Sequence, residues 1–283
     1  MILIADSGST KTDWRFIDEQ KNIHQYATQG FNPYFQTEDE ISEIIKSELL
    51  EKANNLFSMI PVSIYFYGAG CGAASKNEII RKALIKSFPL SLIEVNTDLL
   101  GAARSLCGTE QGVVAILGTG SNTCYYDGSA IIENISSLGY ILGDEGSGAH
   151  IGKTFIQLYL NKEMPNDIAA RFFERFNLST ADILDAVYKK PMPNRFLASI
   201  SKFIYQNIKN QFIVDLVSNC FEEFFNKHIC KYNMHKEVKL RCVGSVAFYY
   251  SNILRAVASN KKVNIDIIIE TPISGLTLFH MPQ

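Results

Sequence analysis

The segment Asp6–Thr12 reads Asp-Ser-Gly-Ser-Thr-Lys-Thr and directly follows the apolar run of residues 2–5. Small residues in a turn let backbone N–H groups approach phosphate oxygens, and an aspartate at its start can hold Mg²⁺ directly or through water. The G-x-x-x-x-G-K-[ST] pattern is absent, and a plain hairpin turn with a capping aspartate is the alternative. We predict a phosphate-binding turn with Asp6 as metal ligand and phosphate contacts from Ser9, Thr10, Lys11 and Thr12.

A second polar glycine turn, Gly118–Asn122, follows the apolar run of residues 113–117. A single turn of this kind is weak evidence for a phosphate site, because turns rich in glycine, serine and threonine are common. Two of them, at equivalent places in two similar halves of a chain, can hold a polyphosphate together. The predicted phosphate contacts here are Gly118, Thr119 and Gly120.

Asp98 lies between the two turns, at the start of a predicted helix. A hydroxyl group that attacks a phosphate needs a carboxylate within hydrogen-bond reach to accept its proton. Asp98 is our candidate for this general base. The alternative is that Thr97 or Asp98 only caps the helix.

Asp144 and Glu145 are adjacent carboxylates in the glycine-rich segment 137–148. Two roles fit them, binding of sugar hydroxyls or coordination of Mg²⁺. The alternative is a solvated acidic turn near the positive N-terminus of the following helix. Further along, Gly244 and Ser245 follow a predicted strand, where a glycine lets a flat ring such as adenine lie against the backbone; an ordinary strand-to-helix turn is the alternative.

The elements that must position these residues form two similar series. In the first half, the pattern predicts strands at 2–6, 12–18, 22–26, 62–67 and 92–95 and helices at 38–56, 77–87 and 98–106. In the second half, it predicts strands at 113–117, 123–126, 130–134, 239–243 and 265–268 and helices at 147–160, 167–176, 180–188, 195–231, 246–258 and 273–279. We therefore predict an α/β protein with a duplicated βββαβαβα topology. Its domains would span residues 1–107 and 108–283, with a helical insertion at about 150–235.

The composition excludes several classes of protein. The chain has 283 residues, of which 47% are hydrophobic and 20% charged, with a formal net charge of −2. This is the composition of a globular protein without a general attraction to nucleic acid or to an anionic membrane. Its start lacks the features of a signal peptide, and no apolar run is long enough to span a bilayer. The six cysteines make no C-x-x-C pair, so we expect reduced thiols. Together these features predict a soluble, cytoplasmic protein.

These segments, in this order, resemble the BadF/BadG/BcrA/BcrD ATPase family and its N-acetylglucosamine kinase branch, within the superfamily of sugar kinases, Hsp70 and actin. Residues 138–147 are similar to the G-x-x-x-G-D-E-G-S signature of that branch. The resemblance implies two ribonuclease H-like (actin-like ATPase) domains around a central cleft. It also implies ATP-dependent phosphorylation of an N-acetylglucosamine-like amino sugar at a hydroxyl group, with Mg²⁺.

The resemblance also implies roles for single residues. Asp98 would be the catalytic aspartate, Thr10 and Thr119 would contact ATP, and Gly244 and Ser245 would form the adenosine turn. Sugar contacts would come from Asn32, Asp98, Ser121, Asn122, Gly139 and Asp144. The sequence departs from the family pattern at Ser7 and Ser9, where many relatives have glycine, and at Leu138, which replaces a tryptophan. The zinc-binding motif of the ROK sugar kinases is missing.

Other interpretations stay open. The same motifs would serve an ATPase activator or sensor that couples ATP hydrolysis to a partner protein, or a sugar-binding module without catalysis. The aromatic residues of 172–225 lie at helical spacings and form either a core or a subunit interface, so a homodimer is an alternative to a monomer. His228 and His235 lack a second pair of metal ligands, which favours a surface or packing role.

Overall fold

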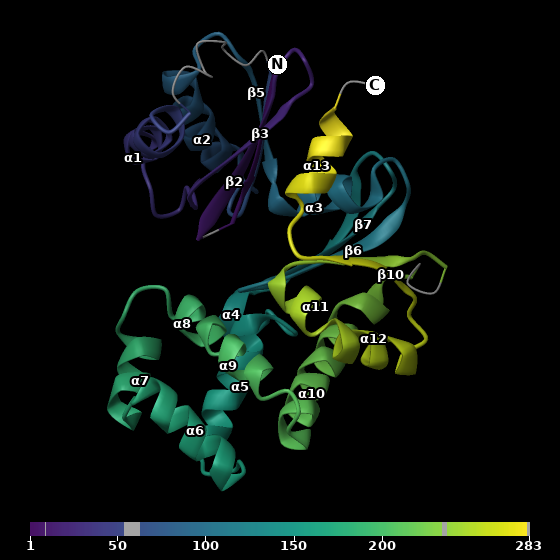
Figure 1. Ribbon diagram of the computed structural model, residues 1–283. Helices are drawn as coiled ribbons and strands as arrows, with labels where there is room; N and C mark the ends of the chain where they lie inside the picture. The colour runs from purple at the N-terminus through teal and green to yellow at the C-terminus, as the bar shows by residue number, and fades with distance from the viewer. Residues whose placement is uncertain (9, 54–62, 234–236, 282–283) are drawn as a thin grey trace. The chain divides into compact units, whose positions relative to one another are not determined.

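The computed structural model describes residues 1–8, 10–53, 63–233 and 237–281. Ser9 and His235 therefore lie outside the described residues. The chain divides into two compact units, shown in Figure 1: unit 1 is Met1–Thr109 with Pro272–Gln283, and unit 2 is Glu110–Thr271. Each unit contains one five-stranded sheet.

The sheet of unit 1 has the strand order β3-β2-β1-β4-β5. Its strands are β1 (Ile2–Ser7), β2 (Lys11–Ile17), β3 (Ile23–Gln29), β4 (Ser63–Gly68) and β5 (Leu92–Thr97). The first three form an antiparallel meander, whereas β1, β4 and β5 run parallel. Parallel strands end at the same edge of a sheet, so the residues that follow β1, β4 and β5 gather there.

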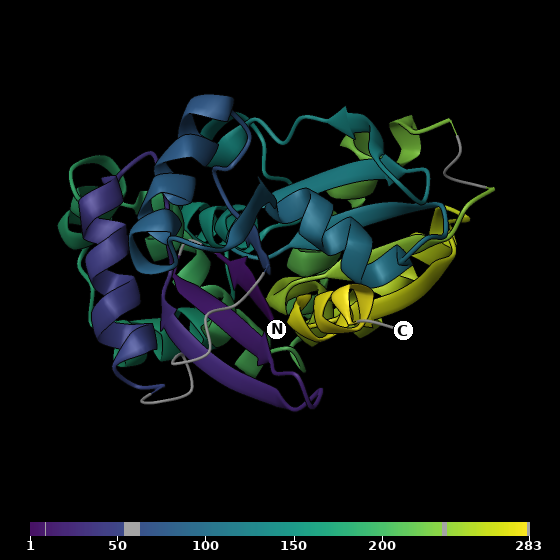
Figure 2. The same ribbon diagram turned by 90° about the horizontal axis from the view of Figure 1, so that it is seen from above.

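Helices cover both faces of this sheet. The helices are α1 (Glu38–Ile44), which continues as the π-helix η1 (Ile45–Leu50), α2 (Ala74–Ser87), α3 (Asp98–Cys107) and α13 (Ile273–His280). Alternate residues of β1 face opposite sides. Leu3 packs in the core that α1 and α2 form on one face, while Ile4 packs with Ile273 and Leu276 of α13 on the other (Figure 2).

The sheet of unit 2 repeats this topology with the order β10-β9-β6-β7-β8. Its strands are β6 (Gly112–Leu117), β7 (Ser121–Tyr126), β8 (Ile131–Ile135), β9 (Leu240–Val243) and β10 (Ile265–Ile269). Again the first three are antiparallel, and β6, β9 and β10 run parallel. The prediction of a duplicated α/β fold is confirmed.

Unit 2 carries most of the helices. They are α4 (Gly139–Leu142), α5 (Gly148–Leu160), α6 (Asn166–Phe176), α7 (Thr180–Tyr188), α8 (Pro193–Ser199), α9 (Ser201–Gln206), α10 (Gln211–Lys227), the 3-10 turn η3 (Ile229–Lys231), α11 (Ser245–Tyr249) and α12 (Ser251–Asn260). Phe172, Phe221, Phe224 and Phe225 are fully buried in the core of this unit. They therefore belong to the core, which was one of the two readings of this aromatic stretch.

The structure differs from the prediction in three elements. The single helix expected at 195–231 is divided into α8, α9 and α10. Asn210 sets the start of α10, because its side chain accepts the Phe212 N–H at 2.9 Å. The helix expected at 246–258 is broken at Tyr250. The helix expected at 38–56 becomes a π-helix from Ile45, and residues 54–56 lie outside the described residues.

The C-terminal segment also differs from the predicted domain division, which placed it in 108–283. Helix α13 belongs to unit 1, where Ile273 and Leu276 are buried against Ile4. The Ser105 hydroxyl donates a hydrogen bond of 2.8 Å to the Pro272 carbonyl and fixes the start of this helix. Apolar burial on the free face of the unit 1 sheet explains why the chain returns there. None of the described helices has the length and apolar composition that a membrane span requires.

Candidate active site

The side chains of Asp6 and Asp98 lie at the edge of the unit 1 sheet where its parallel strands end. Asp6 is near the end of β1, and Asp98 follows β5 directly as the first residue of α3. Thr97 is the cap of α3, because its hydroxyl accepts the Leu100 N–H at 3.1 Å. The Asp98 Oδ1 atom accepts the Leu99 N–H at 2.9 Å. Capping by the Thr97 side chain leaves the Asp98 carboxylate available for a ligand.

The ionised forms of Asp6 and Asp98 are disfavoured at this edge of the sheet. Burial raises the pKa of Asp6 to about 7, and the negative charges of Asp98 and Asp13 add to the effect while Lys11 opposes it. Burial also raises the pKa of Asp98, against the Leu99 N–H, which favours the ionised form. No ion pair links Asp6 or Asp98 to a basic side chain in the part of the chain that the structure describes. A cation bound here would relieve this repulsion.

The turn between β1 and β2 separates its residues into exposed and buried ones. Thr10 and Lys11 are exposed, and Lys11 Nζ lies 2.6 Å from Asp13 Oδ1. Thr12 is fully buried, and its hydroxyl contacts the Ser7 hydroxyl at 2.8 Å and donates to the Gln29 carbonyl at 3.2 Å. The Thr12 side chain thus stabilises the turn from inside, contrary to the prediction that it faces a phosphate. The predicted contact from Ser9 lies outside the described residues.

Asn32 is brought to the same edge by the loop after β3. Its Oδ1 atom accepts the Tyr34 N–H at 3.0 Å, and its own N–H donates to the Gln36 side chain at 2.8 Å. The loop after β4 lies beside it, since a side chain added at Gly70 would meet Asn32 Oδ1 at 3.3 Å. The structure therefore gathers Asp6, Asn32 and Asp98 in one region of unit 1.

The second glycine turn lies in unit 2 and is fastened to the N-terminus of α5. The Gly118 carbonyl accepts the Gly148 N–H at 2.8 Å, and the Thr119 carbonyl accepts the Ala149 N–H at 3.0 Å. The positive end of the α5 dipole therefore lies beside the turn, an arrangement that favours anions.

Asp144 packs directly against this turn. A side chain added at Gly120 would lie 3.1 Å from Asp144 Oδ2, and the Ser121 N–H donates to Asp144 Oδ1 at 3.3 Å. Burial raises the pKa of Asp144, while the Ser121 N–H lowers it. The Ser121 hydroxyl is buried and has no hydrogen-bond partner among the described residues. A polar ligand would satisfy this hydroxyl.

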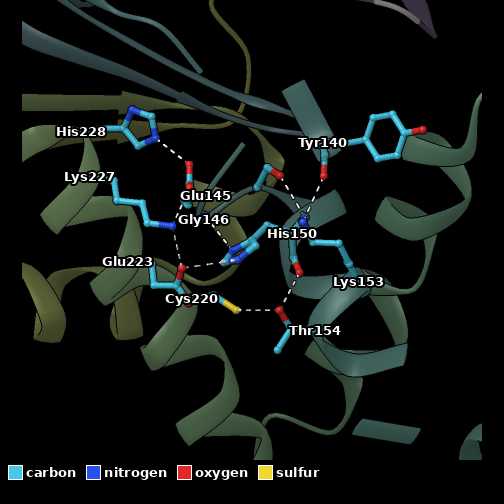
Figure 3. A network of polar contacts seen from close by, with 11 residues as sticks. Tyr140, Glu145, Gly146, His150, Lys153, Thr154, Cys220, Glu223, Lys227 and His228 are labelled. Carbon is cyan, nitrogen blue, oxygen red and sulfur yellow. Dashed lines mark hydrogen bonds and ion pairs between the residues drawn. The ribbon is translucent and has the colours of Figure 1, made fainter. Parts of the chain in front are cut away.

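Glu145 has a different environment from its neighbour. Burial raises its pKa, but hydrogen bonds from Lys227 and His228 outweigh this and hold the pKa of Glu145 at about 2. The sequence suggested a shared role for Asp144 and Glu145. The structure separates them, because Asp144 contacts the glycine turn. Glu145 instead contacts Lys227 and His228 at the end of α10, as Figure 3 shows.

Two further predicted sugar contacts occupy separate places. The Asn122 Oδ1 atom accepts hydrogen bonds from the Thr123 N–H at 3.0 Å and from Asn134 Nδ2 at 2.9 Å, so this oxygen joins β7 to β8. Gly139 opens α4 with a φ of +76°, a conformation that favours glycine. Nothing lies within 4 Å of a side chain added there, so Gly139 borders open space.

A cavity of about 650 Å³ lies within unit 2. Gly118, Thr119 and Ser245 line it, as the sequence predicted for a nucleotide site. Gly244 shapes the turn beside it: its φ is +120°, and an added Cβ would lie 2.3 Å from the Leu117 carbonyl oxygen. Only glycine fits this position without a shift of the backbone.

The comparisons with known proteins identify the family. Residues 5–212 match the model of the BadF/BadG/BcrA/BcrD ATPase family. The chain belongs to this family. None of the curated proteins compared with it matches the sequence.

Solved structures of similar proteins support this assignment. A candidate N-acetylglucosamine kinase from Porphyromonas gingivalis is 42% identical in sequence, with a TM-score of 0.94, over 99% of this chain and 98% of that protein. A candidate N-acetylglucosamine kinase from Chromobacterium violaceum is 14% identical, with a TM-score of 0.75, over 98% of each chain. A ROK family glucokinase from Streptomyces griseus, solved with glucose and AMPPNP, is 11% identical over 98% of this chain and 97% of that protein, with a TM-score of 0.57. The last two show a common fold.

Sequence reasoning missed several residues of this ATPase family member. The cavity in unit 2 is also lined by residues of α8, α9, α11 and the residue after it, among them Lys202, Tyr205, Gln206, Tyr249 and Tyr250. They belong to no motif, because they lie on the faces of helices that only the fold brings together. Asp13 was also missed. The register of the β1–β2 hairpin could have indicated it, because that register pairs Asp13 with Asp6.

The acidic edge of unit 1 is suited to a hard cation. Asp6 supplies a carboxylate oxygen, the kind of ligand that Mg²⁺ prefers. The described residues contain no cluster of three or more His, Cys, Asp or Glu that could hold a metal ion alone. Mg²⁺ bound through Asp6 would therefore complete its coordination with phosphate oxygens and water, which is its usual behaviour with nucleotides.

Proposed function

We propose that this protein transfers the γ-phosphoryl group of ATP to a hydroxyl group of an amino sugar, with N-acetylglucosamine-like sugars as the first candidates. The observation that carries the proposal is the state of Asp98. This carboxylate has a raised pKa and no ion pair with a described residue, and it shares the edge of unit 1 with Asp6 and Asn32. A general base needs this combination of basicity and availability.

The sugar class is supported by the relative from Porphyromonas gingivalis. It is described as a candidate N-acetylglucosamine kinase and is 42% identical over 99% of this chain. Asn32 offers an amide to a sugar, since its side chain oxygen already accepts the Tyr34 N–H while the NH₂ group remains a donor. Asp144 and the unpartnered Ser121 hydroxyl offer an acceptor and a further polar group.

ATP would bind in the cavity of unit 2. Its volume of about 650 Å³ lies within the usual range for small-molecule sites. The rings of Tyr205 and Tyr249, whose centroids are 5.4 Å apart, give the cavity an aromatic wall. Gly118 and Thr119 line it near the N-terminus of α5, which favours the negative phosphates.

Each carboxylate has its own part in the proposed reaction. Asp98 accepts the proton of the sugar hydroxyl as its oxygen attacks the γ-phosphorus. The raised pKa of Asp98 makes it a better proton acceptor than an ordinary aspartate, provided that it is ionised at the working pH. Asp6 would hold Mg²⁺, and the ion would supply positive charge to the phosphates.

A phosphorylation screen tests the proposal. The purified protein is incubated with MgATP and a panel of amino sugars and neutral hexoses, and products are detected by mass spectrometry. The expected result is a phosphorylated product with at least one amino sugar and little with hexoses. Steady ATP hydrolysis without any phosphorylated sugar would contradict the proposal and would favour an ATPase activator.

A further inference from the structure

The side chain of Glu145 points toward the C-terminal end of α10, where Figure 3 shows its contacts with Lys227 and His228. Its Oε1 atom lies 2.8 Å from Lys227 Nζ, and its Oε2 atom accepts a hydrogen bond from His228 Nε2 at 2.9 Å. Glu145 and His228 are both buried. The carboxylate therefore binds two successive residues of one helix end through both of its oxygens.

The backbone next to Glu145 is fixed to the same helices. Gly146 has a φ of +74°, and an added Cβ would lie 2.8 Å from Phe224 Cβ, so the turn packs closely on α10. The Gly146 N–H donates to His150 Nδ1 of α5 at 3.2 Å. On the other side of Glu145, Asp144 has a φ of +55°, an uncommon conformation for a residue with a side chain. Such a conformation persists only where the surroundings impose it.

A second ion pair extends the network along α10. Glu223 Oε2 lies 3.1 Å from Lys227 Nζ and 4.0 Å from His150 Nε2. Burial lowers the pKa of His150, which favours the neutral ring. Because Nδ1 of this ring accepts the Gly146 N–H, the proton of the neutral ring lies on Nε2 and faces Glu223. The turn is thus joined to α10 by the ion pair of Glu145 with Lys227, and to α5 by the hydrogen bond from Gly146 to His150.

The energetics of such a network suggest its purpose. Burying the Glu145 carboxylate is costly, and its ion pair with the half-exposed Lys227 offsets that cost without adding much net stability. Its directional hydrogen bonds, however, define the position of the backbone that carries Glu145. That backbone also carries Asp144, whose carboxylate must lie within a fraction of an ångström of its place to select a ligand.

We propose that Glu145 is a positioning residue: its contacts with Lys227 and His228 hold the turn so that Asp144 meets the sugar. This inference rests on the proposed function, in which Asp144 binds the sugar. It makes the end of α10 a determinant of sugar affinity, although Lys227 and His228 belong to no sequence motif. ATP affinity should not depend on it, because none of these three side chains lines the cavity in unit 2.

The test compares Glu145→Gln, Lys227→Met and the double variant with the wild-type protein. Either single change should raise KM for the sugar by about 10-fold, with KM for ATP changed by no more than about twofold. If Lys227 acts through Glu145, the double variant should resemble Glu145→Gln. The matched control is Asp185→Asn in the same unit. It removes an exposed ion pair in which Lys189 Nζ lies 2.7 Å from Asp185 Oδ1. It should leave both KM values unchanged.

Two measurements separate this inference from folding defects and from the proposed function. Thermal unfolding shows whether the variants are folded, and Lys227 is half-exposed, so its replacement should be tolerated. Amide hydrogen exchange of residues 143–150 should be faster in Glu145→Gln, whether or not a sugar is phosphorylated. Equal rises in both KM values, or unchanged exchange, would overturn the positioning role. A wild-type protein without sugar-dependent ADP release would instead overturn the proposed function, while the exchange result would still decide the role of Glu145.

Discussion

Asp6 and Asp13 lie directly opposite each other as paired residues of the antiparallel strands β1 and β2. Like charges at such positions repel, and Lys11 relieves this repulsion only in part: it lies 2.6 Å from Asp13, and its charge also lowers the pKa of Asp6. Together with burial and with Asp98, this raises the pKa of Asp6 to about 7. The negative charges of Asp6, Asp13 and Asp98 at this edge of the sheet therefore repel one another.

The charge of Asp6 should make the stability of unit 1 depend on pH. In the unfolded chain Asp6 loses its proton near its ordinary pKa of 3.8, whereas in the folded protein it does so at about 7. The folded state therefore binds the extra proton between these values, and stability falls as the pH rises through this window. Above about pH 7 both states are ionised, and the loss is complete. Asp6→Asn should remove this loss.

Urea unfolding at a series of pH values checks this prediction. Trp14 is the single tryptophan and is fully buried in unit 1, so its fluorescence reports on this unit. The free energy of unfolding of Asp6→Asn should exceed that of the wild type by a margin that grows from about pH 4 to about pH 7. Asp167→Asn, at a half-exposed surface position, is the control. A margin that is constant with pH would contradict the raised pKa.

Two glycines beside the cavity of unit 2 should respond differently to replacement by alanine. Gly244→Ala places a Cβ 2.3 Å from the Leu117 carbonyl oxygen at a φ of +120°, so it should lower stability by about 2–3 kcal/mol. Gly118→Ala meets nothing within 4 Å in the protein and should leave stability nearly unchanged. Because Gly118 lines the cavity, its alanine variant should still raise KM for ATP. Calorimetry measures the change in stability, and steady-state kinetics measures KM for ATP. Equal stabilities of the two variants would show that the backbone at Gly244 shifts to accommodate the added Cβ, contrary to the prediction.

Lys202 should contribute to ATP binding through its position on the wall of the cavity. Its charge lies beside the volume that we assign to the nucleotide. Lys202→Met should raise KM for ATP by about 10-fold or more, the lower end of the value of one charge-assisted hydrogen bond, with little change in KM for the sugar. Lys209→Met, an exposed lysine that does not line the cavity, is the matched control. An equal effect of both variants would indicate a general charge effect.

Asn32 offers a way to remove a sugar contact while the local structure stays intact. Asn32→Asp keeps the oxygen that accepts the Tyr34 N–H at 3.0 Å, but it loses the amide donor. It also adds a negative charge close to the carboxylates of this edge. KM for the sugar should rise by about 10-fold or more, and KM for ATP should stay near the wild-type value. A selective rise in KM for ATP would show that Asn32 faces the nucleotide.

Much of the fold could be predicted from local patterns. Strand β1 is a short apolar run that ends in a turn, and its residues face two cores with the expected alternation of Leu3 and Ile4. The same pattern at residues 113–117 revealed the duplication. The return of α13 to unit 1 could not be predicted, because Ile273 and Leu276 would fit any apolar surface and only the fold shows which one is uncovered.

The sequence brought candidate residues together where a motif fixes the backbone, and it missed residues that only the fold brings to the same place. Gly118, Thr119 and Ser245 line the cavity because glycine-rich turns follow strands at fixed places. Thr12 shows the limit, since the sequence does not reveal that its hydroxyl is turned inward to Ser7. Lys202 and Tyr249 lie far apart in the sequence, and no spacing rule connects them. The partners of Glu145 could not be predicted either: of the two alternatives for His228, a surface or a packing role, its burial excludes the first, but the sequence did not reveal its contact with Glu145.

The most direct test of the proposed reaction is the rate of sugar-dependent ADP release by Asp98→Asn. This change is nearly isosteric, and the asparagine oxygen can still accept the Leu99 N–H, so the protein should fold and bind ATP as before. An amide cannot accept the proton of the sugar hydroxyl, and the rate should fall by about 10²- to 10⁴-fold. A rate close to that of the wild type, with the same sugar at saturation, would contradict the assignment of Asp98 as the base.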